Sequence, residues 1–391
     1  MKNNFAAYER KQRIIRMKRR VLTVLAGLSA GSLSQAGPVG GTITRGQGSI
    51  TQNGAQTTVR AGHNTVINWN SFNIGLGETT TFIQPTAASV VWNRITDKNP
   101  SQILGNLNAN GYVVLFNQSG FYFGPNSVVK VGGLLVSTAP VNMPGDNGGA
   151  GWTYNGPPPS ASIINYGKME TKSGGSLFLV AEKIVNHGTL MAPDGTLGLY
   201  AGKEVLVSES PDGRGLSAKV TLPSGSVDNT GQLIADAGTI ALHARTVNNN
   251  GLIQANSMRE RNGVIELVAA EAITLNDHST LQAKGDSTGL SAGGNIVIKT
   301  EGRFTDAAGS IIDVRGGAEG GAGGFAEISG RQMSAIHSHI DGTTQAGFAG
   351  GRLLIDPTDI VFGFNTGENP DALYLDPNGD PSPFAGLSQI T

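Results

Sequence analysis

From Gly37 onward the chain consists of short runs of alternating apolar and polar residues, broken by Gly, Asn and Asp. Between Tyr112 and Phe116, the residues 112, 114 and 116 fall on one face of an extended segment and the residues 113 and 115 on the other, and all five are large. Both faces of this strand are therefore expected to be covered. Helical periodicity is almost absent after Gly37. The pattern predicts an all-β fold.

A repeat begins after Ser160 and is marked by Asn-x-Gly turns. The intervals between the turns are 21, 43 and 20 residues, and we interpret 43 as two periods. The repeated asparagines are Asn165, Asn186, Asn229 and Asn249. Each turn is followed by a second strand, expected at residues 175–180, 196–201, 239–244 and 264–269. The apolar positions of two of these strands match in register, Leu197, Leu199 and Ala201 with Ile240, Leu242 and Ala244.

A period near 20 residues, built from short strands and turns without helices, is typical of a right-handed parallel β-helix. We expect this solenoid to carry capping strands at its N-terminal end and hairpins that leave the coil. If residues 37 to 355 wind at this period, they make about 16 coils and a rod about 75 Å long at roughly 4.8 Å per coil. Leucine-rich repeats have a similar period, but their leucine spacing is missing here.

The N-terminus has the features of a secretory signal peptide. Residues 1–36 contain eight Lys or Arg and one acid, and the basic run is followed by an apolar segment of about ten residues and then by small residues. We predict cleavage between Ala36 and Gly37. A membrane-spanning helix needs roughly 20 apolar residues, about twice the length of this run.

Composition excludes several classes of function. The chain has no cysteine, so disulfides, thiolate metal sites and a cysteine nucleophile are impossible. Residues 37–391 hold 20 bases and 28 acids. An acidic surface argues against nucleic-acid binding, because such binding needs clustered cations to replace phosphate counterions.

The sequence gives only weak indications of a phosphate-binding or metal site. The glycine-rich run at 316–324 lacks the strand, helix and lysine of a phosphate-binding loop, so we interpret it as a solenoid loop. His337 and His339 would share one face of a strand, but two ligands make an incomplete metal site and exposed histidines are the simpler interpretation. No metal or cofactor is expected.

β-Helical enzymes that act on polysaccharides need carboxylates grouped across successive coils. The acids Asp194, Asp228 and Asp236 lie at or near turns, where their capping role explains them, and the repeat offers no aligned carboxylate column. We therefore expect no enzyme. A polysaccharide-active enzyme and an inert, truncated remnant of a larger exoprotein stay as alternatives.

Several stretches together resemble the N-terminal secretion (TPS) domain of two-partner secretion exoproteins, the family of filamentous haemagglutinin and the high-molecular-weight adhesins. The matching stretches are Thr65–Gly75 (TVINWNSFNIG), Val90–Ile95 (VVWNRI), Gln102–Phe123 and Val131–Thr138 (VGGLLVST). The resemblance implies a secretion domain at residues 37–145, after the signal peptide at 1–36. Downstream, the residue pattern predicts β-helix repeats at 146–360, beginning in a Gly- and Pro-rich loop, and a polar tail at 361–391 that is disordered or truncated.

By this resemblance, the Sec machinery exports the chain to the periplasm. An outer-membrane TpsB-type β-barrel transporter with POTRA domains then recognises it and delivers it to the cell surface or medium of a Gram-negative bacterium. There it acts as a haemagglutinin- or adhesin-like protein that binds a receptor on a host cell or another cell. The residues implied in recognition are Asn68, Trp69, Asn70, Phe72, Asn73, Asn93, Arg94, Asn117, Gln118, Ser119 and Gly120.

One departure from the family concerns the turn after the strand 112–116. The family usually has Asn-Pro-Asn-Gly, whereas this chain has Asn117-Gln118-Ser119-Gly120. We expect the turn to survive, because Asn caps it and Gly accepts positive φ, although the rigid proline is missing.

Overall fold

A computed structural model of the protein describes residues 37–139, 152–154, 161–202, 205–209, 216–220, 224–258, 261–333 and 335–359. The predicted signal peptide with Ala36, most of the predicted loop after residue 142 and the predicted tail at 361–391 lie outside these ranges. The regular elements within them are all strands. No helix in the described part of the chain is long and apolar enough to cross a membrane.

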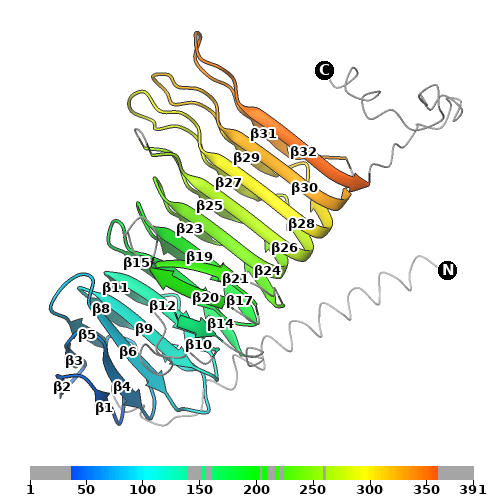
Figure 1. Ribbon diagram of the computed structural model, residues 1–391. Helices are drawn as coiled ribbons and strands as arrows, with labels where there is room; N and C mark the ends of the chain where they lie inside the picture. The colour runs from blue at the N-terminus through cyan, green and yellow to red at the C-terminus, as the bar shows by residue number, and fades with distance from the viewer. Residues whose placement is uncertain are drawn as a thin grey trace, which may run out of the picture.

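The strands wind into a coil with three faces, and successive coils stack through parallel pairing from the blue to the orange end of Figure 1. The first face begins with β4 (Thr65–Trp69), β6 (Val90–Ile95), β9 (Tyr112–Asn117), β12 (Gly133–Ser137), β16 (Leu177–Val180) and β19 (Thr196–Tyr200). It continues in the N-terminal parts of β24 (Thr239–Asn249), β26 (Val264–Leu275), β28 (Asn295–Asp306), β30 (Phe325–Met333) and β32 (Arg352–Asp359).

The C-terminal parts of these five long strands form the second face, so the first two faces share one sheet. The second face starts with β7 (Ser101–Ile103), β10 (Phe121–Phe123), β14 (Ser162–Asn165), β17 (Lys183–Asn186) and β22 (Ser226–Asn229). The third face is a separate sheet. Its parallel strands are β3 (Gln56–Ala61), β5 (Thr79–Ile83), β8 (Asn106–Ala109), β11 (Val128–Val131), β15 (Lys168–Thr171), β18 (Thr189–Met191), β23 (Gln232–Ile234), β25 (Leu252–Gln254), β27 (Thr280–Gln282), β29 (Ile311–Asp313) and β31 (His339–Asp341).

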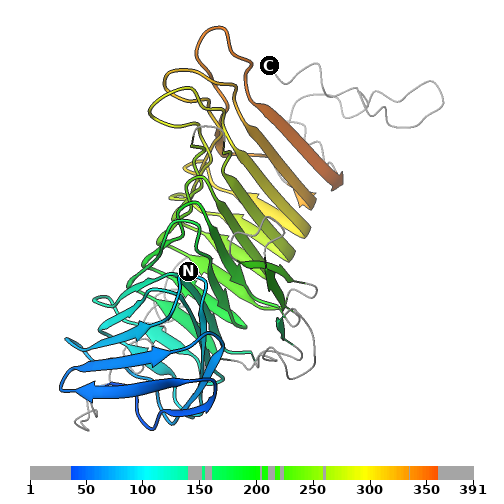
Figure 2. The same cartoon turned by 60° about the vertical axis from the view of Figure 1, so that its left-hand side comes forward.

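Antiparallel strands cap the N-terminal end of the coil. β1 (Thr42–Arg45) pairs with β4, and β2 (Gly48–Asn53) forms a hairpin with β3. Figure 2 shows these strands at the blue end, before the first parallel rung. A second antiparallel sheet leaves the coil and consists of β13 (Trp152–Tyr154), β20 (Val205–Glu209) and β21 (Leu216–Val220). β21 lies against β19. The parallel β-helix with capping strands and extra-helical hairpins is therefore confirmed.

The core consists of columns of like residues along the axis. Leu197 stacks on Ile240, Ile265 and Ile296, one from each successive coil, and each of the four side chains has no exposed surface. The predicted register between the strands at 196–201 and 239–244 is thus confirmed. Full burial of such a side chain stabilises the fold by about 1.5–3 kcal/mol.

The N-terminal part of the first face, from β4 to the start of β24, is buried on its outer side as well. Trp92, Val114, Leu135, Phe178 and Tyr200 form a second apolar cluster there, each at most 2% exposed. Val113 and Leu115 of β9 point instead into the central core. The expectation that both faces of this strand are covered is confirmed.

Two details of the predicted winding are wrong. Asn186 pairs directly with Asn229, so the 43-residue interval is one coil that carries the excursion with β20 and β21, not two periods. Later coils are lengthened by loops between the third and first faces, among them the glycine-rich loop that joins β29 to β30. The strands of the first face listed above are eleven, not about 16, which corresponds to roughly 48 Å along the axis.

Candidate recognition site and corner groove

The turn after β9 forms without proline. The N–H of Gly120 donates to the carbonyl of Asn117 at 3.1 Å, and the N–H of Ser119 donates to Asn117 Oδ1 at 2.9 Å. Gly120 has φ +108°, and a Cβ there would lie 2.7 Å from the carbonyl oxygen of Ser162. Asn caps the turn and Gly supplies the positive φ, as the sequence predicts.

Side chains of the turn anchor it to the preceding coil. Asn117 is fully buried, and its Nδ2 donates to the carbonyl of Asn99 at 3.2 Å and to Ser101 Oγ at 3.0 Å. The hydroxyl of Ser119 donates to the carbonyl of Asp97 at 2.9 Å. A buried amide needs such partners, because an unpaired one costs about 1–3 kcal/mol. Asn117 therefore connects two successive coils through buried hydrogen bonds.

Trp69 and Asn93 form a second buried polar contact. Trp69 Nε1 donates to Asn93 Oδ1 at 2.9 Å, and Asn93 Nδ2 donates to the carbonyl of Val114 at 3.1 Å. Both side chains are 1% exposed, and the ring of Phe72 lies edge-on to Trp69 at 5.5 Å. Strands β4, β6 and β9 are thus joined inside the first coils by one hydrogen-bonded chain.

The predicted recognition residues differ in accessibility. Trp69, Phe72, Asn93, Asn117 and Gly120 are buried. Those at the surface are Asn70 and Gln118, and those half-buried are Asn68, Asn73, Arg94 and Ser119.

Two pairings place the half-buried residues among these strands. Asn68 and Arg94 lie opposite each other between β4 and β6, and Asn73 Oδ1 accepts a bond from the N–H of Gln102 at 2.8 Å. The structure therefore gathers these residues at the first rungs, where about half of them lie inside the fold.

Asparagines of the Asn-x-Gly repeats form a ladder that the sequence interpretation missed. Asn165, Asn186, Asn229 and Asn249 follow one another inside the coil, and each Nδ2 donates to the next Oδ1 at 2.8 Å. The last Nδ2 donates to Ser279 Oγ at 2.6 Å. The recurrence of asparagine at one position of the repeat is the sequence signal that could have predicted the ladder. These residues are internal rungs rather than solvent-exposed turn residues.

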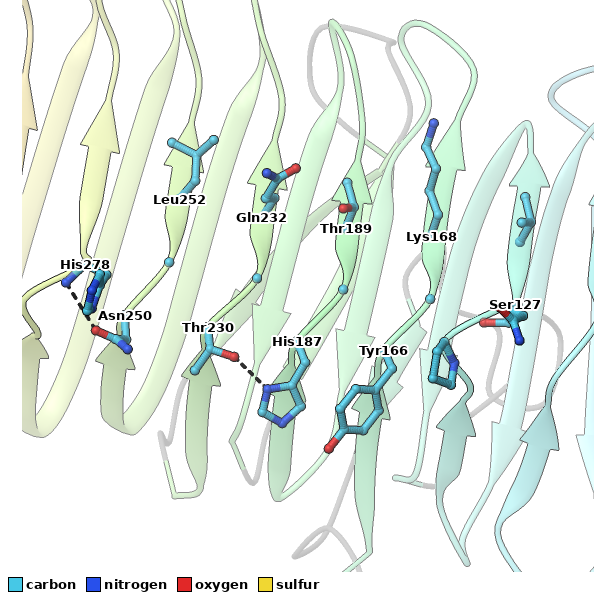
Figure 3. A pocket seen from close by; sticks show the side chains of 17 residues that line it. Ser127, Tyr166, Lys168, His187, Thr189, Thr230, Gln232, Asn250, Leu252 and His278 are labelled. Carbon is cyan, nitrogen blue, oxygen red and sulfur yellow. Dashed lines mark hydrogen bonds between the residues drawn. The ribbon is translucent and has the colours of Figure 1, made fainter.

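The residues between Asn and Gly in these repeats form an outer column at the corner of the second and third faces (Figure 3). The Tyr166 and His187 rings stack at 4.5 Å, and His187 Nδ1 lies 2.6 Å from the hydroxyl oxygen of Thr230. The column continues through Asn250, whose Oδ1 accepts from the N–H of His278 at 3.3 Å.

This column lines a shallow groove of about 910 Å³, which we call the corner groove. The groove extends over the outer surface of the third face, where Lys168, Thr189 and Gln232 line it, and no carboxylate side chain is among its lining residues. The arrangement offers aromatic, imidazole, hydroxyl and amide groups to a ligand. In the sequence, His187 is the middle residue of one of the predicted Asn-x-Gly turns.

Other candidate groups are engaged internally. Asp306 lies 1% exposed on its side chain and accepts bonds from the N–H groups of His337 and Ser338 at 2.8 and 2.7 Å. His337 and His339 are both exposed, as expected, but only His339 lies in a strand. In the ranges that the structure covers, no cluster of three or more His, Asp or Glu residues could hold a metal ion.

Ionisable side chains also lie on the outer side of the first face. Burial raises the pKa of Tyr200 above its ordinary value. His243 Nε2 lies 3.4 Å from Glu266 Oε2, and the contact with this imidazole lowers the pKa of Glu266. His243 contacts both Glu266 and the ring of Tyr200. These three side chains do not place a nucleophile beside a base.

Residues 29–286 match the model of the TPS secretion domain family. The chain belongs to this family. It carries the secretion domain of a two-partner secretion exoprotein, as the resemblance implied, and exoproteins with this TPS domain are secreted by Gram-negative bacteria. The matched region crosses residue 145, and β12 pairs directly with β16 across it, so the predicted division into two domains stays a prediction.

Two relatives of this TPS domain protein are heme/hemopexin-binding proteins of Haemophilus influenzae. One is 30% identical over 282 residues, which are 68% of this chain and 30% of that protein. The other is 27% identical over 273 residues, which are 63% of this chain and 29% of that protein. The chain thus matches under a third of the length of these relatives.

The HMW1 secretion domain from Haemophilus influenzae has the same fold. It superposes with a TM-score of 0.70 over 82% of this chain and all of that domain, at 23% identity. At this identity the likeness concerns the fold alone.

Proposed function

We propose that this protein is the exported member of a two-partner secretion pair. Its partner is an outer-membrane TpsB-type β-barrel transporter, whose periplasmic POTRA domains bind the chain after the Sec machinery has exported it and the signal peptide has been removed. The protein then reaches the cell surface or the medium. Membership of residues 29–286 in the TPS secretion domain family carries this proposal.

The burial of several recognition residues indicates at which stage of export the partner contacts them. Trp69, Asn93 and Asn117 are at most 1% exposed in the folded coil, so a partner can contact their side chains only while the chain is extended. After passage, the same residues bond the first coils together and create the edge on which the next coil pairs. One set of residues thus serves transport first and folding afterwards.

Coexpression tests the export route. The chain is expressed with and without its cognate transporter, and the amount in the medium is measured. We expect release only with the transporter. Equal release without it would contradict the proposal.

At the surface, we propose a haemagglutinin- or adhesin-like role with the corner groove as the receptor-binding surface. The groove is polar and lacks carboxylates, and the exposed Tyr166 ring and the adjacent His187 form its aromatic part. Such groups bind a partner through stacking and hydrogen bonds. The variant Tyr166→Ala/His187→Ala should be exported normally but adhere less to target cells. Unchanged adhesion would remove the groove from this role.

A second candidate is binding of heme or of a heme-carrying protein. The name of the 30%-identical relative supports it, and the chain corresponds to 30% of that protein. Absorption spectra of the purified chain titrated with hemin, and capture on immobilised hemopexin, test it. A spectral shift or capture supports this role over the adhesin, and the absence of both contradicts it.

We propose no catalytic activity and no cofactor. The three acids considered for catalysis bond to their own neighbours. Asp194 pairs with Arg261, Asp228 accepts from Asn248, and Asp236 accepts from Gln254. Assays on uronate polymers should detect no turnover.

A further inference from the structure

Glu78 accepts two backbone hydrogen bonds with a single carboxylate oxygen. The nitrogen of Gly75 lies 2.6 Å from Oε2, and the nitrogen of Gly37 lies 2.9 Å from the same atom. Gly75 belongs to the segment that leads into β5, whereas Gly37 is 41 residues earlier in the chain. Glu78 therefore connects the beginning of the described chain to the first coil.

Gly37 occupies a position that suits only glycine. Its φ is +77°, its surroundings bury it, and a Cβ would lie 2.5 Å from Thr57 Oγ1. The next residues are also held in place, because Val39 pairs with Ser71 as an antiparallel bridge. The segment that holds the predicted recognition residues Asn70 and Phe72 is therefore also the platform on which the N-terminal segment lies.

The predicted cleavage changes the chemistry of this contact. Hydrolysis of the Ala36–Gly37 bond consumes one water, leaves a carboxylate on Ala36 and releases the nitrogen of Gly37 as an amine. A free α-amino group has a pKa of about 7.7–8.0 and is mainly protonated at neutral pH. A donor that was a neutral peptide N–H becomes an ammonium, and a charge-assisted bond to a carboxylate is roughly twice as strong as a neutral one.

We propose that removal of the signal peptide creates an ion pair between the α-ammonium of Gly37 and the carboxylate of Glu78, and that this pair locks the N-terminal cap of the β-helix. The inference rests on cleavage after Ala36, which belongs to the proposed export route. The ion pair lies at the end of the solenoid from which successive coils are added. We therefore expect the cap to be more stable in the processed chain than in the chain that still carries its signal peptide.

The test uses the full exported chain, collected from the medium in the presence of its transporter. N-terminal sequencing first establishes the processed end. The α-amine is then acetylated selectively near pH 6.5, where lysines are almost fully protonated. Urea unfolding is measured before and after acetylation in the wild type, in Glu78→Gln, and in the matched control Glu271→Gln, which removes an exposed carboxylate paired with Arg245.

Acetylation should raise the unfolding equilibrium constant about fivefold in the wild type and in Glu271→Gln, which corresponds to about 1 kcal/mol. In Glu78→Gln the change should be less than twofold, because no carboxylate is left to pair. Equal effects in the wild type and in Glu78→Gln, or no effect in the wild type, would overturn the ion pair. A processed end other than Gly37 would contradict the cleavage step itself, separately from the question of export.

Discussion

The amide nitrogen Nδ2 of Asn186 lies 2.8 Å from Oδ1 of Asn229, although 43 residues separate the two in the chain. The same contact recurs between the neighbouring rungs of the ladder. Each Nδ2 donates to the next coil, and the Oδ1 atoms of Asn186, Asn229 and Asn249 accept from the previous one, so the bonds run along the solenoid axis. The ladder holds successive coils in register at the corner of the second and third faces.

Removal of one rung should destabilise the fold. In Asn186→Ala, the donor of Asn165 and the acceptor of Asn229 lose their partner inside a buried column, and an unsatisfied buried group costs about 1–3 kcal/mol. We expect a loss of about 3 kcal/mol in the free energy of unfolding, measured with urea. The control Asn126→Ala changes an exposed asparagine and should stay within about 0.5 kcal/mol. Similar losses for both would show that the ladder contributes nothing.

A column of glycines beside the ladder permits close approach of the coils. A Cβ at Gly231 would lie 2.1 Å from the carbonyl oxygen of Gly188 in the preceding coil. Gly231→Ala should cost about 2–3 kcal/mol, since the coils must separate locally. Gly350→Ala is the matched control, because its Cβ would meet nothing within 4 Å. Differential scanning calorimetry of the two variants decides the point, and equal melting temperatures would contradict the steric argument.

The turn after β9 should affect export through its buried asparagine. Asn117→Ala removes the cap of the turn and the bonds to Asn99 and Ser101, whereas Gln118→Ala changes only an exposed side chain. We expect Asn117→Ala to lower the amount in the medium several-fold, because a loss of 1–2 kcal/mol changes protein abundance by about that factor. Gln118→Ala should be exported normally. Export losses of the same size in both variants would contradict a special role of the buried asparagine.

The Trp69–Asn93 contact should appear as a coupling energy. Trp69→Phe keeps most of the apolar volume but leaves Asn93 Oδ1 without its donor, at a cost of about 1–3 kcal/mol. In a cycle with Asn93→Ala, the double variant should lose less than the sum of the two single variants by at least about 0.5 kcal/mol. Urea unfolding of all four proteins measures this. Additive losses would exclude the pair as an energetic unit.

Acidic pH should remove the contribution of Glu266 to the stability of the fold. The contact with His243 lowers the pKa of this carboxyl in the folded state, so its contribution to stability is complete above the pKa that the carboxyl has in the unfolded chain. The contribution is lost as the pH falls through the lower folded pKa, where the carboxylate is protonated. The difference in unfolding free energy between the wild type and Glu266→Gln should therefore shrink between about pH 5 and pH 3. A difference that is constant over this interval would contradict the assignment.

Much of the fold could be predicted because its signals are local. Alternation in the strand 112–116, the Asn and Gly of its turn and the register of Leu197 with Ile240 all follow from short-range patterns, and each is present in the structure. The recognition residues were predicted only as a set. Which of them are buried, such as Trp69, and which are exposed, such as Gln118, depends on the coil that covers each residue.

The sequence by itself determined the strands, the turns and the parallel β-helix, because period-two alternation and turn residues act over a few neighbours. Only the tertiary structure decided how many coils form and which residues meet between them. Asn165 and Asn186 are 21 residues apart and Asn186 and Asn229 are 43 apart, yet both pairs are direct neighbours. The reason is physical: an excursion that leaves and re-enters the coil lengthens the chain without changing the rung spacing, so distance along the sequence does not report distance along the axis.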